Sequence, residues 1–246
     1  MTVLARAAAP VDSVACPRPP ARHDAWQVAG LTPLTTIDFP GELAAVLFGP
    51  GCPWRCRYCH NGHLAADSDG PRIEWSEIRS FLESRRGLLD AVVFSGGEPT
   101  AQSGLAVAMA EVKGLGFKVG LHTAGPYPER LPALLPWLDW VGLDIKALPE
   151  DYPAITGVPG SGEPAWRSLH LFLEAGTPMQ VRTTMMPAWR ADDLKPLVDR
   201  LADAGVTHFR MQPLRAAMAL DPAIVEAGDW EVPEAARGYC AALFAP

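Results

Sequence analysis

The chain lacks the features that mark membrane, secreted and nucleic-acid-binding proteins. No stretch of its 246 residues holds the roughly 20 apolar residues in a row that a membrane-spanning helix requires. Residues 1–25 lack the apolar middle of a secretory signal. Positive charge is scarce as well, with a formal net charge of -7, whereas nucleic-acid binding needs a basic surface. We therefore expect a cytoplasmic protein that binds neither membranes nor nucleic acids.

Cysteine is scarce and unevenly placed. Three of the five cysteines, Cys52, Cys56 and Cys59, form a C-x3-C-x2-C cluster, and no fourth cysteine lies near them. Such clustering fits metal chemistry in a reducing compartment better than a disulfide scaffold. Cys16 and Cys240 lie far from the cluster in the sequence and are too few to hold a second iron–sulfur cluster.

Strand-like and helix-like segments alternate from about Trp26 onward. Strands are predicted at 43–48, 91–95, 117–122, 140–145, 179–185 and 207–212. Helices are predicted around 75–86, 102–115, 128–137, 163–175 and 191–204. The strands are apolar nearly throughout, as in a parallel sheet that is covered on both faces.

Six such β-α units are fewer than the eight that close a full barrel. We expect an α/β protein with a partial, open (β/α)6 TIM-like barrel, and the alternative is a doubly wound sheet. Residues 1–25 are predicted to be a flexible extension, and 26–246 a single domain. Its tail, 229–246, is predicted to form one last helix that covers an open side or edge.

Polar or glycine-bearing motifs follow successive strands. The cysteine cluster follows the first predicted strand, 95–100 (SGGEPT) the second and 122–125 (HTAG) the third, and 144–146 (DIK) ends the fourth. Parallel α/β sheets bind ligands at the carboxyl ends of their strands. These motifs are therefore expected to converge on one site.

The three cysteines allow two metal chemistries. A structural zinc site needs four ligands, and His63 could supply the fourth, whereas His60 adjoins Cys59 and would ligate awkwardly. Three thiolates on a four-iron cluster instead leave one iron open for a substrate or cofactor. The missing ligand favours the iron–sulfur interpretation and leaves zinc as the alternative.

Two other motifs could bind a charged ligand. Gly96 and Gly97 would let the backbone approach a ligand, and Glu98 could accept from an amine, although a plain turn is equally compatible. Asp144 and Lys146 lie on the same side of a strand and could form an internal ion pair. Arg182 interrupts an apolar strand and needs an anion, which is either a ligand carboxylate or Asp144.

The cysteine motif, with Tyr58 before its last cysteine, resembles the radical S-adenosylmethionine superfamily. The resemblance implies that Cys52, Cys56 and Cys59 hold a four-iron, four-sulfur cluster, whose open iron binds S-adenosylmethionine. Reductive cleavage then yields a 5′-deoxyadenosyl radical that abstracts hydrogen. It implies that the Gly-Gly-Glu segment binds the amino group of S-adenosylmethionine. The implied cofactor contacts are Tyr58, Ser95, Gly96, Gly97, Glu98, Thr123, Asp144, Lys146 and Arg182.

A narrower resemblance, over roughly residues 30–215, is to the activating proteins of anaerobic ribonucleoside-triphosphate reductase. It is carried by Asp38, Pro40, Gly41, Gly51, Cys52, His60 and Asn61, and by the segments FSGGEPTAQ, LDIKALPEDY, VRTTMMP and MQPLR. The chain departs from the family at Thr123-Ala124-Gly125, where Thr-Asn-Gly is usual. His122 before it is expected to be a packed or capping residue more often than a site residue.

The resemblance implies an enzyme that abstracts hydrogen from a backbone glycine of a glycyl radical enzyme, with anaerobic ribonucleotide reductase as the expected target. A flavodoxin- or ferredoxin-type protein would supply the electron, and the basic residues Arg55 and Arg57 could steer an acidic donor to the loop. One alternative is a radical enzyme for a small molecule, similar to the carboxy-deazaguanine synthases. Another is a zinc-binding interaction module without catalysis.

Overall fold

The computed structural model describes residues 26–66, 69–187 and 189–244. The flexible extension predicted for residues 1–25, together with Cys16, lies outside the described residues. No helix of the described part is both long enough and apolar enough to cross a membrane.

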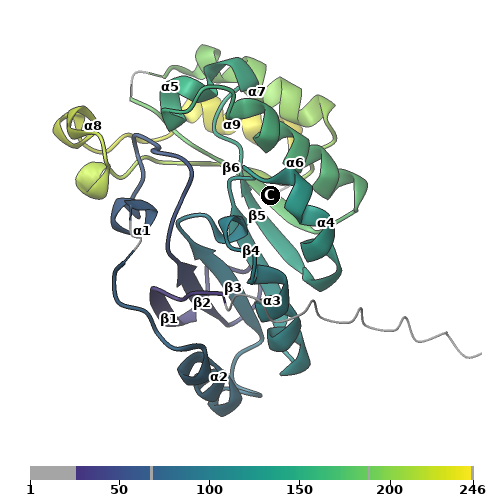
Figure 1. Cartoon of the computed structure of the whole chain (residues 1–246). Helices are drawn as coiled ribbons and strands as arrows, with labels where there is room; N and C mark the ends of the chain where they lie inside the picture. Colours follow the sequence, from purple (N-terminus) through teal and green to yellow (C-terminus); the bar gives the residue numbers. More distant parts are fainter. Residues whose placement is uncertain (1–25, 67–68, 188, 245–246) are drawn as a thin grey trace, which may run out of the picture.

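The described residues form a seven-stranded sheet whose spatial order, β1 to β7, follows the order in the chain (Figure 1). Strands β2 to β7 pair in parallel, while β1 pairs with β2 antiparallel. β1 and β7 are the two ends of the sheet and do not pair with each other, so the barrel stays open. The predicted partial, open α/β barrel is confirmed. The strands are β1 (Gly30–Thr35), β2 (Ala44–Gly49), β3 (Ala91–Gly96), β4 (Lys118–Thr123), β5 (Trp140–Asp144), β6 (Met179–Thr184) and β7 (Phe209–Gln212).

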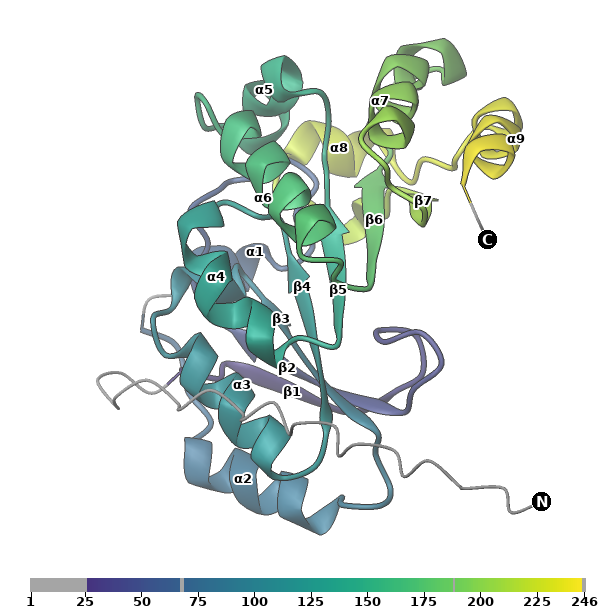
Figure 2. The ribbon, with the colours of Figure 1, turned by 90° about the vertical axis from the view of Figure 1, so that its right-hand side faces the viewer.

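Helices cover the outer face of the sheet, as the 90° view in Figure 2 shows. Four predicted helices correspond to α2 (Trp75–Ser84), α3 (Leu105–Gly114), α6 (Gly162–Glu174) and α7 (Ala191–Asp203). The prediction of one helix over 128–137 is wrong. Pro128, Pro132 and Pro136 each stand in the first turn of a short segment, and a proline supplies no backbone donor to extend a helix. The observed pieces are two 3₁₀ turns, Pro128–Arg130 and Leu135–Trp137, and between them α4 (Leu131–Leu134).

Several short elements were not predicted. They are β1, α1 (Gly62–Ala66), α5 (Tyr152–Thr156) and α8 (Pro222–Ala227). Each helix among them has only five or six residues. A helix that short is marginal without tertiary packing, so local periodicity cannot reveal it.

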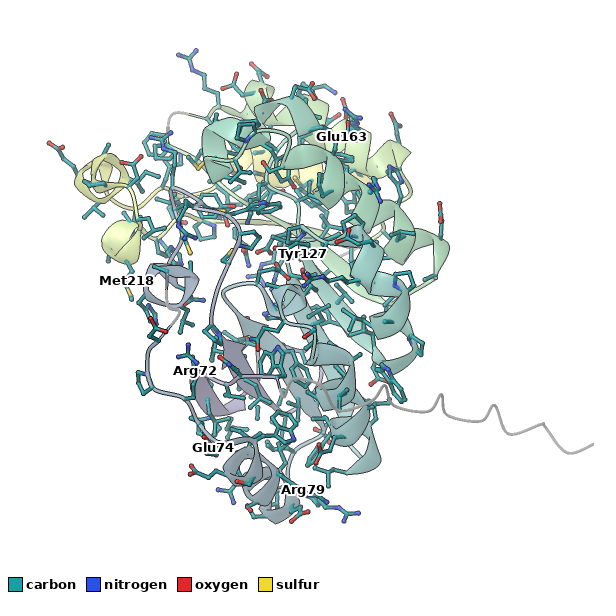
Figure 3. The ribbon with its side chains drawn as sticks, in the orientation of Figure 1. Arg72, Glu74, Arg79, Tyr127, Glu163 and Met218 are labelled. Carbon is teal, nitrogen blue, oxygen red and sulfur yellow. The ribbon has the colours of Figure 1, made fainter. Side chains whose placement is uncertain are left out.

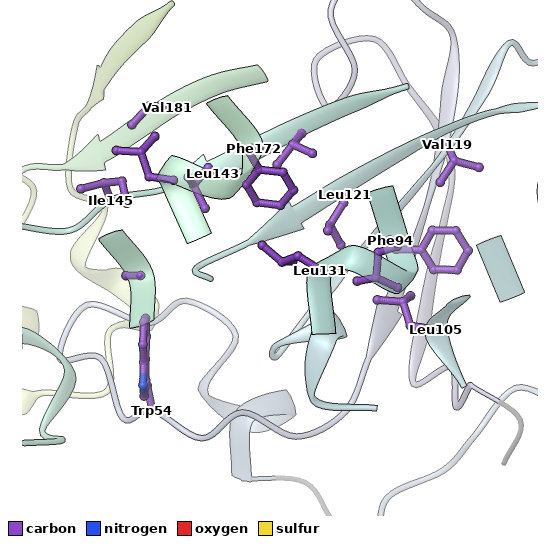
Figure 4. Packing of buried hydrophobic residues seen from close by; sticks show 14 of the residues in the cluster. Trp54, Phe94, Leu105, Val119, Leu121, Leu131, Leu143, Ile145, Phe172 and Val181 are labelled. Carbon is purple, nitrogen blue, oxygen red and sulfur yellow. The ribbon is translucent and has the colours of Figure 1, made fainter. Parts of the chain in front are cut away.

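The two faces of the sheet have different side chains. The outer face buries large apolar residues such as Phe94, Leu121 and Leu143 against the helices, which contribute side chains such as Phe172 of α6 (Figure 4). The inner face is apolar only toward the amino ends of the strands, where Ala44, Val46, Ala91, Val93 and Trp140 pack with Phe39. The inner face is polar toward the carboxyl ends of the strands, which leaves room for a site there.

The tail helix α9 (Glu234–Leu243) packs on α7 and on the end strand β7. Phe244 follows it and places its ring 5.0 Å from the ring of Phe209. The helix expected within residues 229–246 is thus present, and it lies at the free end of the sheet.

The Phe244→Ala variant is expected to lower the free energy of unfolding by about 3 kcal/mol, because it removes a buried aromatic ring from this contact. Urea unfolding measures the loss. The matched control is Leu243→Ala, since Leu243 is 43% exposed and its truncation should change stability by less than about 0.5 kcal/mol. Equal effects of the two substitutions would contradict an anchoring role for Phe244.

Candidate functional site

One cavity of about 510 Å³ opens at the carboxyl ends of the strands. Every residue predicted as a cluster ligand or cofactor contact lines it. These residues are Cys52, Cys56, Tyr58, Cys59, Ser95, Gly96, Gly97, Glu98, Thr123, Asp144, Lys146 and Arg182. The structure therefore brings together residues that lie between Cys52 and Arg182 in the sequence.

The cysteine loop is anchored by the short helix α5. The backbone N–H groups of Arg55 and Arg57 donate to the carbonyls of Thr156 and Ile155, at 2.9 and 3.0 Å. These carbonyls lie at the end of α5, where a helix has acceptors to spare. Trp54 is buried and stands edge-on to the ring of Tyr152 at 5.8 Å. The loop is thus held by backbone hydrogen bonds to α5 and by the packing of Trp54 on Tyr152.

The segment after β7 also contacts the cysteine loop. Arg57 forms an ion pair of 2.6 Å with Asp221, which caps α8, and His60 contacts the carbonyl of Arg215 at 2.5 Å. Met218 of this segment is 62% exposed (Figure 3). Arg55 donates to carbonyls of its own loop, so both arginines are used within the chain. Both side chains are nevertheless exposed, so their role in steering an electron donor stays a prediction.

The three thiols face the cavity from a poorly solvated wall. Burial raises the pKa of Cys52 to about 12 and also raises the pKa values of Cys56 and Cys59. Among the described residues, no three His, Cys, Asp or Glu side chains are arranged so that they could hold one metal ion together. His63, the candidate fourth zinc ligand, is exposed and does not line the cavity. With His63 outside the cavity, the zinc alternative gains no support, whereas three thiols that line one cavity suit a larger multi-iron cluster.

Gly96 and Gly97 allow the end of β3 to pack directly on the cysteine loop. Gly97 and Glu98 donate their N–H groups to the carbonyls of Gly49 and Gly51, at 2.9 and 2.8 Å. A Cβ atom on Gly97 would overlap the carbonyl of Gly51, and one on Gly96 would overlap the backbone of Gly49. The two glycines thus approach the backbone of Gly49 and Gly51 closely, and since both also line the cavity, their predicted approach to a ligand stays a prediction.

Glu98 is buried, and four donors fix its carboxyl group. Oε1 accepts from the N–H and hydroxyl of Thr100 and, at 2.7 Å, from the hydroxyl of Thr123. Among the described residues, Oε2 accepts only from the N–H of Ala124, at 3.0 Å, and it can accept one more bond from a ligand. Burial raises the pKa of Glu98, and these donors oppose that effect. The family departure at Ala124 leaves this contact intact, because the backbone supplies it.

Asp144 links two cations on the inner face. Arg182 donates to its Oδ1 at 2.9 Å, and the ammonium of Lys146 lies 4.0 Å from its Oδ2. Burial would raise the pKa of Asp144, but Arg182 and then Lys146 outweigh it and hold the pKa below its usual value. Lys146 also donates to the hydroxyl of Tyr58 at 3.2 Å. The two ion pairs that the sequence suggested, Asp144 with Lys146 and Asp144 with Arg182, are therefore confirmed. The cluster of these three groups can still bind a ligand carboxylate.

His122 packs against this cluster. Its Nε2 contacts the carbonyl of Asp38 at 2.9 Å, and its ring meets that of Trp140 edge-on at 5.6 Å. Gly142 makes room, since a Cβ there would lie 2.9 Å from both Arg182 and His122. His122 is thus a packed residue that also lines the cavity.

Sequence reasoning missed three polar residues that line the same cavity, Thr184, Arg210 and Gln212. They occupy alternate positions with Arg182 on the inner face of β6 and β7, where Arg182 pairs with Arg210 and Thr184 with Gln212. Polar residues at alternate positions along β6 and β7 would have predicted that these side chains share the inner face.

Comparison with known proteins identifies the family. A model of the radical SAM superfamily matches residues 46–209, which is more than half of the chain. The chain therefore belongs to the radical S-adenosylmethionine superfamily. Membership implies a four-iron, four-sulfur cluster and S-adenosylmethionine, and a single cavity lined by three thiols and a ring of charged groups suits both.

The similar proteins of known name include activating enzymes. A Methanocaldococcus jannaschii protein assigned as a glycyl-radical enzyme activating enzyme is 32% identical over 55% of this chain and 57% of its own length. Pyruvate formate-lyase-activating enzyme of Streptococcus mutans is 29% identical over 67% of this chain and 68% of that protein. The chain thus spans between about half and two thirds of the relatives it matches.

Solved structures support the fold alone. Streptococcus suis SuiB bound to the precursor peptide SuiA has a TM-score of 0.56 at 16% identity, over 68% of this chain and 38% of that chain. TYW1 with a lysine-pyruvate adduct bound has a TM-score of 0.54 at 15% identity, over 72% of this chain and 66% of that chain.

The Gly97→Ala variant is expected to lose most of its bound iron, because the added Cβ displaces Gly51 and with it the cysteine loop. Iron and acid-labile sulfide per chain, measured after anaerobic reconstitution, report the effect. Gly114→Ala is the matched control, since a Cβ there meets nothing within 4 Å. Full iron content in Gly97→Ala would contradict this reading of the glycine.

His122 is expected to make the fold acid-sensitive. Burial, and then the charge of Arg182, lowers its pKa to about 4, against about 6.5 in an unfolded chain. The unfolded state therefore binds more protons between these values, and stability falls as the pH is lowered from about 6.5 to about 4, by up to about 3 kcal/mol.

Urea unfolding across this pH range tests the expectation on the wild type and on His122→Gln, which keeps a donor for the carbonyl of Asp38. The wild type should lose more stability than the variant on acidification. Parallel pH profiles would mean that other groups cause the acid sensitivity.

Proposed function

We propose that this chain is a radical S-adenosylmethionine enzyme that activates a glycyl radical enzyme. One observation carries the proposal: three thiols, the fixed carboxyl of Glu98 and the Lys146–Asp144–Arg182 cluster line a single cavity in an open barrel. The relatives named for glycyl radical enzyme and pyruvate formate-lyase activation support it.

The chain's own residues would hold the two cofactors in that cavity. Cys52, Cys56 and Cys59 would ligate the iron–sulfur cluster, with Tyr58 beside them. Glu98 would accept a hydrogen bond from the amino group of S-adenosylmethionine through Oε2. Ser95, Gly96 and Gly97 would line the part of the cavity that S-adenosylmethionine occupies. Once bound, these cofactors supply a 5′-deoxyadenosyl radical that takes a hydrogen atom from a substrate carbon.

The cation cluster would bind the other end of the amino acid. Lys146 is buried and remains charged, since Tyr58, Cys56 and Asp144 offset the cost of its burial and raise its pKa well above the usual value. Arg182 and Lys146 would attract the methionyl carboxylate, and Asp144 would accept from the ribose. Thr123 would act through Glu98, whose carboxyl group it holds in place.

A protein substrate suits the open sheet. β1 and β7 leave a side of the barrel unpaired, through which a loop of another protein could bring its glycine to the cavity. The segment from Asp38 to Asn61 supports anaerobic ribonucleotide reductase as the target, whereas the named relatives include activators of pyruvate formate-lyase. A flavodoxin- or ferredoxin-type protein would supply the electron.

The test is anaerobic reconstitution with iron and sulfide, followed by addition of S-adenosylmethionine, a strong reductant and a candidate partner. We expect 5′-deoxyadenosine, together with a glycyl radical on the partner detected by electron paramagnetic resonance. Cys56→Ala should abolish both products, while Cys240→Ala, outside the cavity, should retain them. Glu98→Gln should keep its iron and bind S-adenosylmethionine about tenfold more weakly, because a charge-assisted bond is lost.

Two partners, anaerobic ribonucleotide reductase and pyruvate formate-lyase, should be compared side by side. A radical on one of them alone would identify the target. 5′-Deoxyadenosine formation driven by a small pterin-like substrate, without a radical on either protein, would contradict the activase proposal and favour the small-molecule alternative. A purified protein that contains zinc but no acid-labile sulfide would contradict the radical S-adenosylmethionine chemistry itself.

A further inference from the structure

The chain leaves the sheet at the end of β5, and side chains from other elements then hold it. The last register pair between β5 and β6 is Asp144 with Arg182. Lys146 lies two residues further on, beyond that ladder. Its backbone N–H donates instead to the hydroxyl of Tyr152 in α5, at 3.0 Å. The backbone position of Lys146 therefore depends on a side chain of α5.

Both neighbours of Lys146 are fixed in a similar way. The hydroxyl of Thr183 in β6 donates to the carbonyl of Ile145 at 2.5 Å. The indole N–H of Trp166 in α6 donates to the carbonyl of Ala147 at 3.0 Å. All of these side chains are buried, and buried backbone groups need such partners. Side chains thus replace the sheet as the support of this segment.

Tyr152 also contacts the cysteine loop. Its ring meets that of Trp54 edge-on at 5.8 Å, and the carbonyls at the end of α5 accept from the backbone N–H groups of Arg55 and Arg57. The side chain of Tyr152 is fully buried and does not line the cavity. One buried side chain therefore connects the loop that carries the thiols with the segment that carries Lys146.

α5 is itself held firmly in place. The hydroxyl of Thr156 donates to the carbonyl of Tyr152 at 3.0 Å and lies 2.7 Å from the hydroxyl of Ser161. Gly162, at the start of α6, packs on Pro149 so closely that a Cβ would lie 2.2 Å from the carbonyl oxygen of Pro149. A helix of five residues needs contacts of this kind to form. These contacts make α5 a fixed support.

The ammonium of Lys146 depends on this support. Nζ donates to the hydroxyl of Tyr58 at 3.2 Å and lies 4.0 Å from Oδ2 of Asp144. A lysine carries its charge on a long stem that is flexible in water, but the side chain of Lys146 is only 6% exposed. Because neighbouring atoms confine the stem, a displacement of the backbone displaces the ammonium as well.

We propose that Tyr152 is a positioning residue that holds the ammonium of Lys146 where it meets the carboxylate of S-adenosylmethionine. The inference rests on the proposed function, in which Lys146 and Arg182 attract that carboxylate. Tyr152 does not reach the cavity and acts through the N–H of Lys146. Without the hydroxyl, this buried N–H loses its acceptor, and the backbone shifts to recover one.

The experiment compares two ligands on the full chain reconstituted with iron and sulfide. S-adenosylmethionine has the carboxylate, whereas its decarboxylated form keeps the amino group, the sulfonium and the adenosine. Isothermal titration calorimetry without a reductant measures both affinities. Tyr152→Phe keeps the ring against Trp54 and removes only the hydroxyl. We expect the variant to bind S-adenosylmethionine about tenfold more weakly, and to match the wild type in its iron content and its affinity for the decarboxylated form.

A second variant tests whether Tyr152 acts through Lys146. Lys146→Met keeps most of the buried stem and removes the charge, so it should weaken the binding of S-adenosylmethionine alone. Tyr152→Phe added to Lys146→Met should cause no further loss, because the two changes remove one interaction. Tyr127→Phe is the matched control, since Tyr127 stacks with Arg130 and does not line the cavity. It should bind both ligands as the wild type does.

Three results would overturn the proposal. One is an equal loss of affinity for both ligands in Tyr152→Phe, which a general structural effect would produce. Another is an unchanged affinity of that variant for S-adenosylmethionine. The third is a pair of losses that add in the double variant, since Tyr152 would then act independently of Lys146.

The proposed function and the role of Tyr152 fail separately. A wild type that binds both ligands equally would contradict the carboxylate contact assigned to Lys146 and Arg182. A wild type that prefers S-adenosylmethionine, together with a Tyr152→Phe variant that keeps this preference, would contradict the role of Tyr152 alone. A chain that shows all the expected affinities but never forms a radical on a partner protein would contradict the activase function and leave the role of Tyr152 standing.

Discussion

Two backbone hydrogen bonds join the parts of this site on which its chemistry depends. Gly97 and Glu98 donate to the carbonyls of Gly49 and Gly51, so the end of β3 and the start of the cysteine loop form one rigid unit. The contact exists because Gly97 has no side chain at a point where a Cβ would overlap the loop. The backbone of the cysteine loop and the backbone of Glu98 are thereby held in register with each other.

The charged groups of the inner face follow from this arrangement. A buried charge is tolerated only when it is paired, and Lys146, Asp144 and Arg182 pair with one another across β5 and β6. These ion pairs let a polar layer exist above the apolar cluster around Phe39 and Trp140. With two cations to one carboxylate, the three groups keep a net positive charge, which a bound anion would offset.

The sequence predicted well those elements whose signal is local. Six strands were found because each is a short apolar run, and the cysteines because their spacing is rare. Prediction failed for elements whose formation depends on tertiary contacts. The antiparallel strand β1 and the short helices α5 and α8 exist only through tertiary contacts, such as the bonds from Arg55 and Arg57 to the end of α5. The segment 128–137 had helical periodicity, but its prolines divide it.

Spacing and periodicity were enough to predict the cluster motif, the alternation of strands and helices, and the convergence of motifs at one end of the sheet, because these features depend only on covalent order. Which side chains contact one another depends on the folded structure. It pairs Arg182 with Asp144 and Arg57 with Asp221, fixes Glu98 through Thr123, and leaves Arg210 without a partner among the described residues. These outcomes depend on register between strands and on packing across the barrel, which a linear pattern does not specify.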